Sequence, residues 1–328
     1  MTEVTSGGGQ AAPPFGGAVT ARLRADLHAQ VSTVVVGQSH VIDAVLAASA
    51  VGGHLLIEGP PGIAKTLLAT AVARACGLEG RRVQFTPDLL PSDLTGSLAL
   101  RDGRLSFRPG PVFTNVLLAD EINRTPPKTQ AALLEAMQEG QVSVDGTSHP
   151  LPSPFLVLAT QNPIEFEGTY PLPEAQIDRF LMKVTMGYPS AADEESLLRL
   201  ARSGVSPVTL DLVRRVADAS TFAAMRAEVD AVTVADSLVS YIAAVVRRTR
   251  ELPSVSLGAS PRAGVHLLAA AKAWACLSGR SYVVPDDVVA LVPPVLGHRL
   301  VLTAEAELDR FTAEQAVRTV LASVPVPR

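Results

Sequence analysis

Five short apolar runs, each separated from the next by enough chain for a helix, constrain the fold of this sequence more than any other feature. Strands that are apolar throughout, with helices between them, are typical of a parallel sheet covered on both faces. The sequence therefore predicts an α/β fold with a central parallel sheet. The runs are Leu55–Ile57, Val83–Phe85, Val116–Ala119, Phe155–Ala159 and Leu181–Met186.

The alternation of strands and helices stops after Tyr188, and the rest of the chain is rich in Ala, Leu and Val at helical spacing. We therefore expect an α/β domain over residues 21–188 and a smaller all-α domain over residues 189–328. Residues 1–20 contain much Gly and Pro, which favours a flexible tail.

Composition narrows the class of protein. Hydrophobic residues make up 47% of the chain and charged residues 18%, so a folded globular protein is expected. The net charge of -4 excludes a global basic field that would attract nucleic acid. No apolar run approaches the roughly 20 residues that span a bilayer, and the first residues do not form an export signal. We expect a soluble, cytoplasmic protein whose two cysteines, Cys76 and Cys276, are buried free thiols.

The segment "HLLIEGPPGIAKTLLATAVA" at residues 54–73 predicts a phosphate-binding loop between a strand and a helix. "GPPGIAKT" fits the pattern GxxxxGK[ST], except that Ala64 stands in place of the second glycine. Backbone N–H groups and the helix N-terminus can converge on phosphate oxygens there. The nucleotide-binding residues expected from this loop are Gly59, Pro60, Pro61, Gly62, Ile63, Ala64, Lys65, Thr66 and Leu67.

Within this loop we expect ATP and Mg²⁺ as ligands, with Lys65 reaching the β- and γ-phosphates and Thr66 coordinating the metal. We expect helical dihedral angles at Ala64, which alanine accepts. Gly59 and Gly62 are then the positions that can take a positive φ.

Polar side chains end two of the predicted strands. Asp120 and Glu121 follow an apolar run, where Asp120 fits a Mg²⁺ ligand and Glu121 the base that polarises the attacking water. Asn162 ends the next strand, at the edge where ligands of parallel sheets gather. The alternatives are that the acidic pair caps a helix, although Pro126 and Pro127 place the helix start further on, and that "QNP" is a simple turn.

Two segments near residues 97–108 and 141–151 are predicted to be β-hairpins. Asp102-Gly103 and Asp145-Gly146 stand between short alternating runs, a strong hairpin signal. These hairpins either reach a partner or only cover sheet edges.

Several long segments, in order, resemble the MoxR branch of the AAA+ ATPases, in the clade with a helix-2 insert. They include "GPPGIAKT", "LLADEINR", "KTQAALLEAMQEGQVSVDG", "LATQNPIEFEGTYPLPEAQIDRF" and "GASPRAGVHLLAAAKAWACLSGRSYVVPDDV". The resemblance extends from about Val34 to Leu300. It implies an AAA+ P-loop core with an all-α lid, and an alanine at position 64 is usual in this branch.

The resemblance also implies roles for residues that the spacing alone does not assign. Arg179 in "QIDRF" is similar to the arginine finger, and Arg262 in "GASPRA" to the sensor 2 arginine of the lid. Gly37 and Gln38 resemble the segment that packs on adenine. His298 and Arg299 match the C-terminal pattern of the family, and we expect them to pack the lid.

Within the same resemblance, Lys65 and Thr66 belong to Walker A, Asp120 and Glu121 to Walker B, and Asn162 to sensor 1. All of these groups serve hydrolysis of ATP to ADP and phosphate, so we expect an ATPase.

The resemblance finally implies a biological role. We expect a homo-oligomeric ring, most often a hexamer, that acts as a chaperone for a client protein. Its work would be metal or cofactor insertion or complex assembly, with a von Willebrand factor A domain partner. The alternatives are a nucleic-acid-dependent motor and a nucleotide-gated scaffold. We expect no nucleic-acid partner, because neither hairpin combines basic residues with stacking aromatics well.

Overall fold

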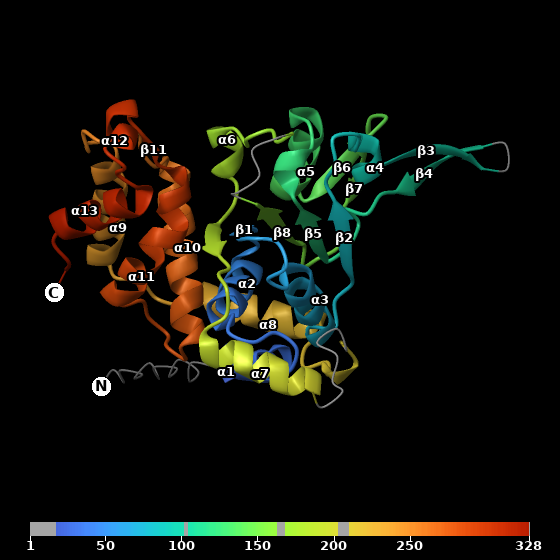
Figure 1. Cartoon of the computed structure of the whole chain (residues 1–328), viewed down its shortest axis with the longest axis horizontal. Helices are drawn as coiled ribbons and strands as arrows, with labels where there is room; N and C mark the ends of the chain where they lie inside the picture. Colours follow the sequence, from blue (N-terminus) through green and yellow to red (C-terminus); the bar gives the residue numbers. More distant parts are fainter. Residues whose placement is uncertain (1–17, 102–103, 163–167, 203–209, 328) are drawn as a thin grey trace, which may run out of the picture.

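The computed structural model describes residues 18–101, 104–162, 168–202 and 210–327 (Figure 1). Most of the expected N-terminal tail and the Asp102-Gly103 turn lie outside these residues. The domain boundary near residue 189 stays a prediction.

A five-stranded parallel sheet forms the centre of the molecule, as the sequence predicted. Its spatial order is β2-β5-β8-β1-β9. The strands are β1 (Leu55–Glu58), β2 (Gly80–Gln84), β5 (Val116–Asp120), β8 (Leu156–Gln161) and β9 (Met182–Thr185). β2 begins three residues before the apolar run, because an edge strand has one open side where Arg81 and Arg82 reach solvent.

Alternate residues of each central strand pack into two different cores. In β1, Leu55 and Ile57 contact the core built with α1 (Ala18–Val31), α2 (Ser39–Val51) and α3 (Lys65–Ala75). Leu56 faces the opposite core, built with α4 (Pro91–Thr95) and α5 (Pro127–Glu139). The side-chain period of two in a strand thus places helices on both faces of the sheet.

The C-terminal helices form a bundle beside the sheet (Figure 1). Its helices are α9 (Asp236–Thr249), α10 (Pro261–Leu277), α11 (Pro285–Leu296), α12 (Ala304–Leu308) and α13 (Ala313–Ser323). A short antiparallel pair, β10 (Val255–Leu257) with β11 (Val301–Leu302), joins them. α10 packs against α2, and both contribute to one continuous core.

The remaining elements are α6 (Glu174–Ile177) before β9, then α7 (Ala191–Arg202) and α8 (Ala219–Asp230) between β9 and the bundle, and the 3-10 turns Ile122–Arg124, Leu210–Leu212 and Gly297–Arg299. α8 packs against α1 and α2, and the Glu228 carboxylate accepts hydrogen bonds from Thr20 near the start of α1.

Both predicted hairpins are present. β3 (Gly96–Arg101) pairs with β4 (Arg104–Pro109), and β6 (Gln141–Val144) with β7 (Thr147–Pro150). At the second turn, Asp145 and Gly146 have φ of 49° and 75°, as a two-residue hairpin turn requires. The rings of Phe107 and His149 stack at 3.9 Å, so the two hairpins contact each other. The first hairpin extends away from the body of the protein (Figure 1).

Cys76 and Cys276 are buried free thiols, as expected. Among the described helices, none is long and apolar enough to cross a membrane.

Candidate active site

A cavity of about 700 Å³ lies at the carboxyl ends of the central strands. It brings together most residues that the sequence singled out, although they come from four separate segments. Its lining is Val34, Val35, Val36, Gln38, Pro61, Gly62, Ile63, Ala64, Lys65, Thr66, Leu67, Arg82, Asp120, Glu121, Asn162, Tyr188, Pro189 and Leu197. Gly37, Gly59 and Pro60 adjoin this lining without being part of it.

The phosphate loop differs from the expectation at Ala64. Ala64 has φ of 66° and ψ of 27°, so it is left-handed and not helical. It precedes the first residue of α3, and the loop must reverse direction there before the helix begins. The prediction of helical angles was wrong because the turn into the helix, and not the helix itself, sets the conformation of residue 64.

The two glycines of the loop serve different purposes. Gly62 has φ of 82°, which a residue with a side chain rarely adopts. Gly59 has no positive φ, contrary to what we considered; instead, a Cβ at Gly59 would lie 2.3 Å from the Met186 carbonyl oxygen. Gly59 is therefore needed for close approach of two chain segments.

Lys65 lies at the first position of α3, where unpaired backbone N–H groups and the helix dipole favour an anion. Its side chain is buried, and its Nζ donates to the Gly59 carbonyl oxygen at 2.8 Å. The ammonium group of Lys65 is therefore buried inside the loop, where it can neutralise phosphate charge.

Asp120 is buried at the end of β5 and is held on both sides. Thr160 Oγ1 donates to its Oδ1 at 2.6 Å, and Arg82 donates to its Oδ2 from Nη2 at 2.7 Å and from Nε at 3.1 Å. The Arg82 side chain is half exposed, so this ion pair is only partly shielded from water.

Glu121 follows in a left-handed conformation, with φ of 58°. Its backbone N–H donates to Thr160 Oγ1 at 2.9 Å, and its Oε2 accepts from Gln84 Nε2 at 2.6 Å. Arg124 Nε lies 3.0 Å from the same oxygen. Strained backbone of this kind persists where surrounding contacts enforce it, which is common in active sites.

Sequence reasoning missed Arg82, Gln84 and Arg124. Arg82 and Gln84 are two residues apart on β2 and so face the same side, next to Asp120, which ends the paired strand β5, and Glu121, which follows it. Their polar alternation is visible in the sequence, but the strand order that brings β2 beside β5 is not.

The oxygen atoms available in this cavity fit Mg²⁺ bound together with a nucleotide. Thr66 and Asp120 both line it, and Mg²⁺ is commonly held by one or two protein oxygens plus phosphates. No group of three His, Cys, Asp or Glu residues that could hold a metal by itself occurs in the described part of the chain.

Part of the cavity wall is apolar and suits a base ring. Val34, Val35, Tyr188, Pro189 and Leu197 line it. Gln38 Nε2 donates to the Gly187 carbonyl oxygen at 3.1 Å, which joins the segment before α2 to the segment after β9. Gly37 has φ of 78°, which makes the turn before α2 possible.

Arg179 and Arg262 are not part of this cavity. β1 and β9 run parallel, with Leu55 beside Met182 and Glu58 beside Thr185. Arg179 precedes β9, whereas the phosphate loop follows β1. The two therefore lie beyond opposite ends of strands that span about 13 Å.

Arg179 and Arg262 instead line one smaller cavity of about 330 Å³. No Asp or Glu lines it, and within the described residues neither guanidinium has a carboxylate partner. Burial lowers the pKa of His54 and of His266 in its wall to about 4, so both rings are neutral near pH 7. The positive charge of this cavity thus comes from the two arginines.

Comparison with known proteins agrees with this geometry. A family profile described as "ATPase family associated with various cellular activities (AAA)" matches residues 54–182, and an AAA lid domain profile matches residues 247–320.

Relatives of full length were also found. Chaperone MoxR1 of Mycobacterium tuberculosis (strain ATCC 25618 / H37Rv) is 44% identical, over 99% of this chain and 90% of its own. YeaC of Bacillus subtilis (strain 168) is 48% identical, over 90% and 92% respectively. A crystal structure from Cytophaga hutchinsonii ATCC 33406, described as a candidate ATPase, has a TM-score of 0.87 at 40% identity and covers 95% of this chain and 98% of its own.

Proposed function

Because the chain belongs to the MoxR family of AAA+ ATPases, we propose that it hydrolyses ATP to ADP and phosphate at sites shared between neighbouring copies in a ring. The ring is most often a hexamer in this superfamily. We further propose that the protein is a chaperone, as the name Chaperone MoxR1 says of its Mycobacterium relative, and that it remodels or matures partner proteins.

The residues of the large cavity divide the chemistry between them. The loop from Pro61 to Leu67 binds the phosphates through backbone N–H groups, and Lys65 adds the charge that holds the β- and γ-phosphates. Thr66 and Asp120 would hold Mg²⁺, which when bound neutralises charge developing on the phosphate oxygens.

The remaining two residues act on water and on the terminal phosphate. Glu121 polarises the attacking water and takes its proton at a carboxylate oxygen. Asn162, buried at the end of the neighbouring strand β8, orients the water or the γ-phosphate by hydrogen bonding.

The observation that carries the shared-site proposal is the carboxylate-free cavity holding Arg179 and Arg262. It lies at the opposite end of the sheet from the phosphate loop, so these arginines cannot serve the nucleotide of their own chain. Two guanidinium groups without carboxylate partners are suited to an anion. A neighbouring copy whose phosphate-loop cavity faces this pair would supply that anion and complete both half-sites.

Such an arrangement links hydrolysis to movement between copies, because each nucleotide would be held by two subunits. We propose that this movement acts on a client protein, with a von Willebrand factor A domain partner and in the cytoplasm. The projecting β3–β4 hairpin is a candidate contact for either protein.

A nucleic-acid motor is less well supported. A motor of this kind would need an exposed aromatic ring on which a base can stack. Phe107, the hairpin ring suited to this, already stacks on His149 within the protein. A nucleotide-gated scaffold is also less well supported, since Glu121 lies in the cavity that holds Lys65 and Asp120.

The test is ATP turnover per chain across a wide range of protein concentrations, at saturating ATP and Mg²⁺. Turnover per chain should rise steeply and level off as copies assemble. Mixing Arg179→Ala with Glu121→Gln should restore activity that neither variant has alone, since a ring then contains some sites with both groups. Constant turnover per chain and no gain on mixing would contradict the shared site.

A further inference from the structure

Arg299 of the lid is the most thoroughly bound arginine of the protein's described part. It ends the 3-10 turn that follows α11, and its side chain is 2% exposed. Its Nε donates to Asp178 Oδ1 at 2.8 Å, and its Nη2 donates to the carbonyl oxygens of Asp178 at 3.1 Å and Phe180 at 2.5 Å. Its Nη1 also reaches the Leu181 carbonyl oxygen at 3.3 Å. These acceptors are the residues on both sides of Arg179.

A second tie joins the same segment to the lid. Ser260 caps the N-terminus of α10, and its Oγ donates to both carboxylate oxygens of Asp178, at 3.2 and 3.0 Å. Arg262 stands two residues further along α10. His266, one turn after Arg262, accepts a hydrogen bond from Arg299 Nη2 at its Nδ1, at 2.7 Å. Asp178 and Arg299 thus connect the Arg179 segment to the helix that carries Arg262.

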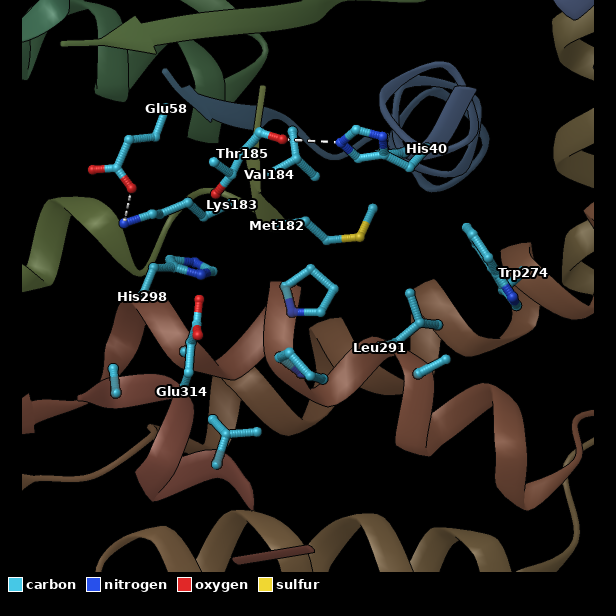
Figure 2. Close-up of a pocket in the computed structure, with 17 residues that line it drawn as sticks. His40, Glu58, Met182, Lys183, Val184, Thr185, Trp274, Leu291, His298 and Glu314 are labelled. Atoms are coloured by element: carbon cyan, nitrogen blue, oxygen red, sulfur yellow. Dashed lines mark hydrogen bonds and ion pairs between the residues drawn. The ribbon is translucent and has the colours of Figure 1, made fainter. Parts of the chain in front are cut away.

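The lid does not hold the neighbouring strand in the same way. Beside β9 it leaves a cavity of about 460 Å³, between the strand and helices α11 and α13 (Figure 2). Lys183 of β9 turns to Glu58 of β1, 2.6 Å away, and Thr185 O accepts from His40 of α2. Among the described contacts, Arg299 donates hydrogen bonds to residues 178–181, which lie just before β9, and none to β9 itself.

We propose that Arg299 is a positioning residue, which, through Asp178 and with Ser260, fixes Arg179 and Arg262 as one unit so that both reach a neighbouring copy's phosphates together. The inference rests on the proposed shared site. Arg179 then moves with the lid, and a change in lid position moves both arginines at once. The resemblance implied only that Arg299 packs the lid.

The chemistry of the clamp explains why arginine is required there. Its planar fork donates in several fixed directions, and lysine, a single point donor, cannot serve Asp178, two more carbonyls and His266 together. Arg299→Lys keeps the charge opposite Asp178 while losing this fork. The variant therefore loosens the Arg179 segment without leaving the partly buried Asp178 carboxylate unpaired.

The experiment measures ATP turnover and KM for Arg299→Lys, alone and mixed with Glu121→Gln, at the protein concentration where turnover levels off. We expect turnover to fall on the order of tenfold or more, since small displacements of a charge-stabilising group reduce rates strongly. KM for ATP should change little, because the phosphate loop of the variant is untouched.

Mixing gives the decisive readout. The Arg299→Lys chain keeps an intact phosphate-loop half-site, which a Glu121→Gln neighbour with a well-placed Arg179 can complete. The mixture should therefore exceed the sum of its two components, as a mixture of Arg179→Ala with Glu121→Gln should.

Two further variants keep the test independent of folding. Arg280→Lys is the matched control, because Arg280 forms a similar two-pronged ion pair with buried Asp287 elsewhere in the lid. It should leave turnover near that of the unmodified protein. Ser260→Ala leaves the Arg299–Asp178 ion pair in place and should lower turnover by a smaller factor than Arg299→Lys, with the same unchanged KM.

The outcomes separate the two proposals. If Arg179→Ala is rescued by mixing but Arg299→Lys is not, or if Arg299→Lys and Arg280→Lys reduce turnover equally, the positioning role is overturned and the shared site stands. If Arg299→Lys fails to fold, unchanged turnover of Ser260→Ala overturns the positioning role, and a lower turnover that mixing rescues supports it. If Arg179→Ala itself is not rescued, the shared site and the positioning role fall together.

Discussion

The two ends of the central sheet carry opposite chemistry. At the carboxyl ends of the strands, a cavity combines a lysine and a helix N-terminus with the carboxylates Asp120 and Glu121, each held by partners within the chain. At the other end, a cavity holds Arg179 and Arg262 with no carboxylate among its lining residues. The first is a nearly complete nucleotide site, and the second is complementary to the negative charge such a site would contain. If the proposed shared site is correct, the difference means that one chain carries two halves of a site that face away from each other.

The largest effect is expected from a variant that changes only the cavity with the phosphate loop. Glu121→Gln should lower turnover on the order of 10³-fold, because the amide cannot take the proton of the attacking water. ATP binding should persist, since the phosphate loop is unchanged. Phosphate release and equilibrium binding of ATP measure the two effects. Glu139→Gln, at the exposed end of α5, is the control and should behave like the unmodified protein.

The second effect concerns pH and the arginine cavity. Burial holds the pKa of His54 at about 4, below the usual value of 6.5, so the unfolded chain takes up this proton first as the pH falls. This contribution of His54 to the free energy of unfolding is fully present above pH 6.5. It is lost as the pH falls towards 4, and the total loss is on the order of 3 kcal/mol at most.

Urea unfolding at several pH values between 7.5 and 4.5 measures this loss. His54→Gln should flatten the pH dependence, whatever its effect on stability at pH 7.5. An unchanged slope in His54→Gln would show that other groups govern acid sensitivity.

The third effect concerns the cavity that holds Arg179 and Arg262. Arg262→Ala should lower turnover per chain by about tenfold, because the proposed shared site then loses one of its two guanidinium groups. KM for ATP in the chain's own cavity should change less. Arg318→Ala, exposed on α13, serves as the control. Equal turnover for Arg262→Ala and the control would remove Arg262 from the shared site.

The smallest effect sharpens the picture of the phosphate loop. Ala64→Gly should leave the free energy of unfolding unchanged or raise it by up to about 1 kcal/mol, because glycine adopts the left-handed conformation without strain. Gly62→Ala is the matched opposite and should destabilise by about 1 kcal/mol. Urea denaturation of both variants checks the signs, and a loss of stability in Ala64→Gly would contradict a strained Ala64.

The sequence by itself determined the parallel sheet and most of the nucleotide cavity. Apolar runs at regular spacing must bury both faces, and the polar residues that end those runs must meet, because parallel strands share one carboxyl edge. Asp120, Glu121 and Asn162 could therefore be placed near Lys65 without coordinates. The hairpin at Asp145-Gly146 followed in the same way, since two adjacent residues that tolerate positive φ define its turn.

Only the tertiary structure decided the features that depend on contacts between distant segments. The left-handed turn at Ala64 is imposed by the closure of the loop onto α3. Arg82 and Gln84 reach the acidic pair because β2 lies beside β5, an order that no local pattern encodes. Arg179 falls at the far end of the sheet, and Arg299, distant in sequence, clamps the segment beside it. Local physics sets which residues end a strand, whereas the packing of helices and strands sets which strand ends and loops meet.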